Sequence, residues 1–208
     1  MTKPCPWSDV AHQVPPRRGD SVRGIRWAAE HHKPWADVNV GISSDGVAVA
    51  AHGSPYGLAQ QGFLPRGDFR QVRDLTDEEL SRLVSPDGYH IPTMREIFHT
   101  AAHHGRKVEP EAKHDHRFTF QRTWWDLARD ARSAWGEDWP EHTCMKILTD
   151  LEAGDRGLEF ALAVMEAAHQ EGWRTMVLPR GRHRLRVIAG PSITYNRGGR
   201  CRRILRRS

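Results

Sequence analysis

Apolar and polar residues along the chain follow the periods typical of strands and helices. Alternation with a period of two predicts strands, whereas apolar residues every three or four positions predict helices. We therefore expect extended segments at 8–12, 36–40, 47–51, 107–112, 144–148 and 175–178, and helices at 21–32, 118–134 and 158–170. Two further helices are expected after Thr76 and Thr93, because a glutamate three residues later completes a capping box at each. Strands separated by helices predict an α/β fold with a parallel sheet.

The segment from residue 36 to residue 53 combines a strand pattern with side chains suited to catalysis. Alternation places Asp37 and Asn39 on one face of the first extended run, opposite its apolar residues. A turn at residues 44–46 leads into a second run that ends at His52. Two oxygen-bearing side chains near a histidine can hold a divalent cation beside an acid/base group. A surface hairpin with polar side chains is the alternative.

A second strand pattern, at residues 107–113, carries further charged groups. Glu109, Glu111 and Lys113 share one face by the period of two. A carboxylate can bind a cation there, and a lysine two residues on can neutralise a phosphate oxygen. Glutamate–lysine alternation on an exposed edge strand is the alternative.

Length and composition indicate the class of protein. A chain of 208 residues can bury a sizeable core and predicts one domain. No apolar run approaches the roughly 18 residues of a membrane-spanning helix, and the first residues lack the basic and apolar regions of a signal peptide. Cys5, Cys144 and Cys201 form no CxxC pair, which favours reduced thiols. We therefore expect a cytoplasmic protein.

Positive charge is concentrated near the carboxyl end. The formal net charge is +5, and five arginines lie between residues 200 and 208. They are Arg200, Arg202, Arg203, Arg206 and Arg207. The rest of the chain is neutral, so we expect one globular domain over 1–190 and a basic, disordered tail over 191–208. Such a tail could bind nucleic acid or an acidic surface.

Histidines and tryptophans offer two further candidate sites. The chain has 13 histidines, several in pairs, which makes zinc binding an alternative. Most of them lie at predicted helix ends, where solvent or the helix dipole accounts for a histidine equally well. The four tryptophans between 118 and 140 could bind a ligand, but packing of outer helices explains them more simply. They are Trp124, Trp125, Trp135 and Trp139.

Several short motifs occur in a fixed order between residues 8 and 113. They are Ala11-His12, Asp37-Val38-Asn39, Ser44-Asp45-Gly46, His52, Asp74-Leu75-Thr76, Ile91-Pro92-Thr93 and Glu111-Ala112-Lys113. Their order and spacing resemble those of the glycerophosphodiester phosphodiesterase family. The resemblance implies a TIM-type (β/α) barrel, whose site lies at the carboxyl ends of the strands. Because 208 residues are fewer than the roughly 250 of a complete barrel, we expect a barrel that is shortened or irregular in its second half.

The resemblance also implies an activity and the residues that perform it. The substrate would be a glycerophosphodiester, hydrolysed to an alcohol and glycerol 3-phosphate. The implied general acid/base pair is His12 and His52, and the implied phosphate-binding residue is Lys113. The implied ligands of one divalent cation, Mg²⁺ or Ca²⁺, are Asp37, Asn39 and Glu111.

The chain departs from the family's motifs in three respects. His12 is followed by Gln13 and Val14 where the family has arginine and glycine, and Gly53 stands where the family has aspartate. Asn39 stands where the family has an acid, and the loss of that charge weakens cation binding. The first alternative is therefore a catalytically weakened relative that binds a phosphate ligand or a protein partner. The second is a nucleic-acid-associated protein that acts through its arginine-rich tail.

Overall fold

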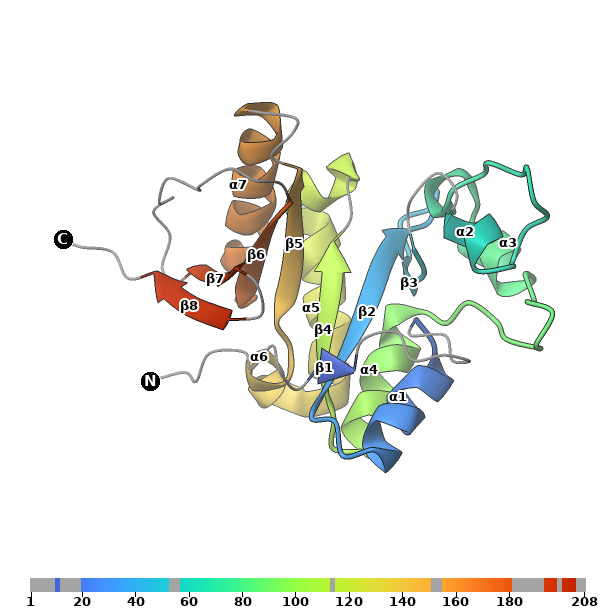
Figure 1. Ribbon diagram of the computed structural model, residues 1–208, viewed down its shortest axis with the longest axis horizontal. Coiled ribbons are helices and arrows are strands. Elements are labelled where there is room, and N and C mark those ends of the chain that lie inside the picture. Colours follow the sequence, from blue (N-terminus) through green and yellow to red (C-terminus); the bar gives the residue numbers. More distant parts are fainter. Residues whose placement is uncertain are drawn as a thin grey trace.

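The computed structural model describes residues 10–11, 20–52, 57–112, 115–150, 155–180, 193–197 and 200–204 (Figure 1). The strands are β1 (Val10–Ala11), β2 (Trp35–Ile42), β3 (Ala48–Ala50), β4 (Lys107–Ala112), β5 (Met145–Asp150), β6 (Thr175–Arg180), β7 (Ile193–Arg197) and β8 (Arg200–Ile204). The α-helices are α1 (Val22–Glu30), α2 (Gly57–Gln60), α3 (Asp77–Ser81), α4 (Met94–His103), α5 (Gln121–Trp135), α6 (Trp139–His142) and α7 (Asp155–Gln170). The 3₁₀ helices are η2 (Val72–Asp74), η3 (His116–Thr119) and η4 (Gly136–Asp138).

The strands form one sheet in the order β1-β2-β4-β5-β6-β7-β8, with β3 paired to β2 outside this path. Neighbours from β1 to β7 along this path are parallel. The β2–β3 and β7–β8 pairs are antiparallel. Helices α1, α4, α5 and α7 precede β2, β4, β5 and β6, as in a (β/α) barrel. The path ends in the antiparallel β7–β8 pair, and no ladder joins β8 to β1 in the described strands, so the second half is irregular.

The carboxyl-terminal segment differs from its prediction. Residues 191–208 were expected to form a disordered tail, but β7 and β8 lie within this segment and pair over five positions. Ile193, Thr194 and Tyr195 are β-branched or aromatic, and such residues favour strands. A prediction based on the arginine content of the segment overlooks that preference. The suggested nucleic-acid contact of this segment stays a prediction.

The helices begin where capping residues predict. Ser21 caps α1 through its side chain. Thr76 and Thr93 form the two predicted capping boxes with Glu79 and Glu96, at the starts of α3 and α4. None of the helices in the described part of the chain has the length and apolar content needed to cross a bilayer.

The main hydrophobic core lies between the sheet and its helices. Figure 1 shows α4 beside β4, α5 next to α4, and α7 beside β5. Trp124 and Trp139 are 0% and 2% exposed and belong to this core, as the packing interpretation predicts. Trp125 is 43% exposed, and the guanidinium groups of Arg122 and Arg129 lie over its ring. Its surface position is therefore explained by cation–π contacts.

A second, smaller core follows the β2–β3 hairpin. Its apolar side chains include Val49, Leu58, Leu80 and Ile91, which come from β3, α2, α3 and the segment before α4. Figure 1 shows this lobe beyond the carboxyl end of β2. The lobe therefore lies at the edge of the sheet where (β/α) barrels carry their functional sites.

Candidate functional site

The central strands carry a row of buried polar side chains on the face turned away from the helices. In the sheet register Asp37 pairs with Glu109, Asn39 pairs with Glu111, and Glu111 pairs with Lys146. Paired residues project to the same side of a sheet, and the apolar residues between them pack against the helices. Asn39, Glu109, Glu111 and Lys146 are between 0% and 8% exposed. The register thus brings together the two acidic strand faces that the sequence predicts separately.

Lys146 lies between two of the predicted metal ligands. Its Nζ donates to Asp37 Oδ1 at 2.6 Å and to Oδ2 at 2.7 Å, and it forms an ion pair with Glu111 Oε2. The lysine side chain is 3% exposed. Burial opposes the charge, but the two carboxylates outweigh burial and raise the pKa of Lys146. One ammonium group therefore joins β5 to both β2 and β4.

Asn39 is held by a carboxylate that precedes α1. Its backbone N–H donates to Asp20 Oδ1 at 2.7 Å, and its Nδ2 donates to Oδ1 and Oδ2 at 3.0 Å each. Asp20 is 6% exposed and also accepts a hydrogen bond from Gln61 Nε2 at 2.8 Å. The amide nitrogen of Asn39 is thus directed at Asp20. The residues that make up what we call the polar cluster are Asp20, Asp37, Asn39, Glu111 and Lys146.

Gln61 connects His52 to the polar cluster. The backbone N–H of His52 donates to Gln61 Oε1 at 3.2 Å, while Gln61 Nε2 bonds Asp20. Gly57 packs against the same backbone, since a Cβ at that position would lie 1.8 Å from the His52 carbonyl oxygen. The predicted catalytic histidine is therefore fixed near the cluster by two main-chain contacts.

Comparison with solved structures establishes the fold. A protein from Galdieria sulphuraria, assigned as a glycerophosphodiester phosphodiesterase, superposes with a TM-score of 0.55 at 15% identity, over 83% of this chain and 82% of its own. A glycerophosphodiester phosphodiesterase from Parabacteroides distasonis gives 0.54 at 17% identity, over 81% of this chain and 63% of its own. A protein from Silicibacter pomeroyi, assigned as a glycerophosphoryl diester phosphodiesterase, gives 0.55 at 18%, over 77% and 61%. The chain has the glycerophosphodiester phosphodiesterase fold.

That fold is the α/β, TIM-type barrel that the sequence predicts, and its irregular second half is confirmed. No protein-family model and no curated protein matches the sequence. Identities of 15–18% show the shared fold alone. The chemistry of the chain therefore depends on the residues of its own site.

The predicted divalent cation does not fit the site as these residues are arranged. A cation bridging Asp37 and Glu111 would take the position of the Lys146 ammonium, and the amide nitrogen of Asn39 is directed at Asp20. Among the described residues, no group of three or more His, Cys, Asp or Glu side chains is placed to hold a metal ion, zinc included. Lys146 on β5 already provides positive charge to both carboxylates.

Arg117 fixes the chain that follows β4 against the end of β2. Its guanidinium donates to the carbonyl oxygens of Ile42 and Ser43 and to the Asp115 carboxylate. Burial would raise the pKa of Asp115, but the hydrogen bonds and charge of Arg117 lower it below the usual value. This pair therefore holds the segment that follows β4 against the carboxyl end of β2.

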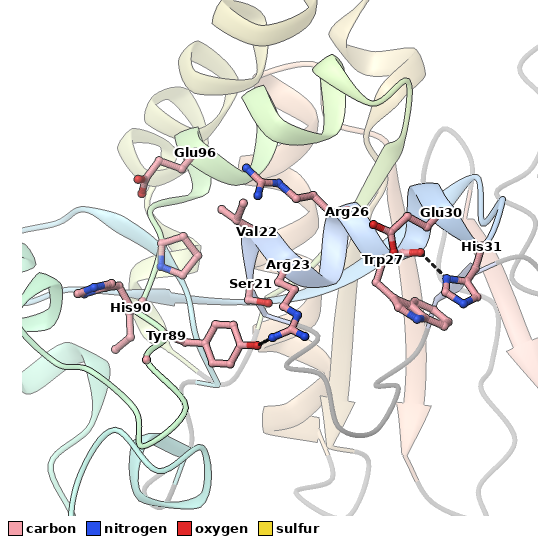
Figure 2. Close-up of a pocket in the computed structure, with 13 residues that line it drawn as sticks. Ser21, Val22, Arg23, Arg26, Trp27, Glu30, His31, Tyr89, His90 and Glu96 are labelled. Atoms are coloured by element: carbon pink, nitrogen blue, oxygen red, sulfur yellow. Dashed lines mark hydrogen bonds between the residues drawn. The ribbon is translucent and has the colours of Figure 1, made fainter.

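A groove of about 820 Å³ lies along the outer side of α1 (Figure 2). Figure 2 shows Arg23 and Arg26 on α1, with Tyr89 and His90 across from them on the segment before α4. Of the predicted site residues that the structure describes, none lines this groove. The candidate site of the chain is therefore the polar cluster.

The structure shows where four of the predicted site residues lie, and their roles stay predictions. Asp37, Asn39 and Glu111 converge on one face, and His52 is linked to them through Gln61. His12 and Lys113 lie outside the described residues. Sequence reasoning missed Asp20, Gln61 and Lys146, which hold the cluster together. A lone lysine within the predicted 144–148 strand was the one available signal for Lys146.

Proposed function

We propose that the chain hydrolyses a small phosphodiester of the glycerophosphodiester class, releasing an alcohol and glycerol 3-phosphate. The observation that carries the proposal is the convergence of Asp37, Asn39 and Glu111 on one sheet face, within the fold of glycerophosphodiester phosphodiesterases. Barrels of this type carry their sites at the carboxyl ends of the strands. The smaller core that follows the β2–β3 hairpin lies at that edge, and His52 directly follows the hairpin, which supports the same location.

The proposed chemistry is proton transfer by two imidazoles. One of His12 and His52 accepts a proton from the attacking water molecule as the water oxygen forms the new P–O bond. The other donates a proton to the leaving alkoxide as the ester P–O bond breaks. Imidazole titrates near neutral pH and can play either part. No step uses a divalent cation, since the carboxylates that would bind it contact Lys146.

We propose that two lysines neutralise the negative charge of the phosphate group. Lys113 directly follows β4, and Lys146 contributes an ammonium group to the polar cluster. Cationic groups positioned before the reaction stabilise the charge that develops on phosphoryl oxygens.

A second candidate function is phosphate-ligand binding without turnover. The contact of Lys146 with both carboxylates favours this candidate. The ammonium charge is shared between Asp37 and Glu111, so it stabilises less of the charge that develops on a phosphoryl group during hydrolysis. The two candidates differ in one measurable respect, which is the appearance of product.

The experiment is release of glycerol 3-phosphate from glycerophosphocholine and from glycerophosphoethanolamine. The proposal predicts release by the wild-type chain and its loss in His12→Ala and in His52→Ala. His99→Ala is the matched control, because His99 lies on α4 and bonds Ser133 Oγ at 3.0 Å, outside the polar cluster. Saturable binding of glycerophosphocholine without product would select the second candidate. Release that is undiminished in both active-site variants would refute the histidine mechanism.

A further inference from the structure

We propose that Lys146 is the resident cation of the polar cluster and excludes divalent metal ions from Asp37 and Glu111. The inference deepens the proposed function, on which it rests for the identity of the site. It assigns the role expected of Mg²⁺ or Ca²⁺ to a side chain of the protein itself.

The geometry places one positive centre where a bridging metal would bind. Lys146 Nζ lies 2.6 and 2.7 Å from the two oxygens of Asp37 and also contacts Glu111 Oε2. Calcium and magnesium bind oxygen ligands at about 2.0–2.6 Å. A metal ion bridging the same two carboxylates would therefore overlap the ammonium group. Binding of the ion requires Lys146 to leave.

Moving Lys146 away from the two carboxylates is energetically unfavourable in this fold. Lys146 is 3% exposed and stands on β5, which has β4 on one side and β6 on the other. Withdrawing its ammonium from both carboxylates would leave a buried charge without its partners, which is unfavourable. The lysine is also covalently held at the site, so it competes at a high effective concentration with an ion from solution.

Asn39 strengthens the distinction from a metal site. Its amide nitrogen donates to both oxygens of Asp20, so that carboxylate is engaged by hydrogen-bond donors from Asn39 and Gln61. The Asp20 carboxylate therefore already accepts hydrogen bonds from two side chains. A cation bound to Asp37 and Glu111 could use Asp20 as a third carboxylate ligand only if those hydrogen bonds broke. The carboxylates of the cluster thus accept hydrogen bonds from nitrogen donors, and Lys146 is one of these donors.

The test is calorimetric titration of the full chain with CaCl₂ and with MgCl₂ alone. We expect no saturable binding by the wild-type chain at millimolar metal. We expect Lys146→Met to bind with a Kd on the order of 10⁻⁴ M, the range of weak calcium sites. Adding Asp37→Asn to Lys146→Met should abolish that binding. Lys107→Met is the matched control, since Lys107 lies on β4 with its Nζ over the Trp35 ring, and it should behave as wild type.

A second measurement guards against a variant that fails to fold. Thermal unfolding of the wild-type chain should be unchanged by CaCl₂ or MgCl₂ at about 10 mM, which is roughly 100 times the Kd expected for the lysine variants and would clearly stabilise a chain that binds the ion. Thermal unfolding of Lys146→Gln should shift upward under the same conditions. Saturable wild-type binding that Asp37→Asn removes would overturn the inference, and so would folded Lys146→Met or Lys146→Gln chains that bind no metal. Absence of hydrolysis would refute the proposed function and leave these titrations unaffected.

Discussion

Replacing Lys146 with methionine removes the ammonium group that Asp37 and Glu111 share. Methionine is unbranched and apolar, so it fills much of the same space without charge. The Asp37 and Glu111 side chains are 18% and 8% exposed, so water replaces the lost ammonium only in part. Two carboxylates on neighbouring strands are then left without their common partner.

The expected cost follows from that burial. Removing one partner of a buried ion pair destabilises a protein by about 3–5 kcal/mol. We expect a loss in this range at pH 7, which is a large part of the 5–15 kcal/mol total that is typical of a domain. The pKa of Lys146 is raised, so its stabilising contribution is present below the ordinary lysine value of 10.5 and is lost as pH rises through the folded-state value. Measurements at pH 7 therefore record the whole contribution.

The assay is urea unfolding of wild type, Lys146→Met and Lys107→Met at pH 7. Lys107 Nζ lies 5.5 Å from the centre of the Trp35 ring, and loss of such a contact costs about 1 kcal/mol. If both variants lost the same small amount of unfolding free energy, the central role of Lys146 in the cluster would be refuted.

Two other predictions concern His52 and the pH dependence of stability. Gly57→Ala should displace the His52 backbone and reduce hydrolysis, because the new Cβ would lie 1.8 Å from the His52 oxygen; steady-state kinetics in which Gly57→Ala keeps full activity would contradict this. Burial lowers the pKa of His169, which contacts Thr175 Oγ1 at 2.8 Å, so protonation favours the unfolded chain. Thermal unfolding should show stability falling as pH drops below 6.5 toward the folded-state pKa, less steeply in His169→Gln; equal slopes would count against the assignment.

Much of the fold was readable from local sequence patterns. The strand predicted at 107–112 corresponds to β4 residue for residue, and the capping glutamates mark the starts of α3 and α4. These features depend on neighbours within a few positions. β7 and β8 were missed because the arginine content of their segment was given more weight than its β-branched and aromatic residues.

The centre of the site was not readable in the same way. Alternation placed Asp37 with Asn39 and Glu109 with Glu111, but only the register brings the two strands together. Lys146 reaches Asp37 across 109 positions of sequence, and no local pattern reports such a contact. The sequence therefore predicted the carboxylates and a cation between them, and the structure shows a lysine in that position.

The most direct test of the account is glycerol 3-phosphate release from glycerophosphocholine in the presence of EDTA, measured for wild type and His52→Ala. The account predicts product from the wild-type chain at the same rate with and without EDTA, and none above background from His52→Ala. Product that appears only after Mg²⁺ or Ca²⁺ is added, or no product under any condition, would contradict it.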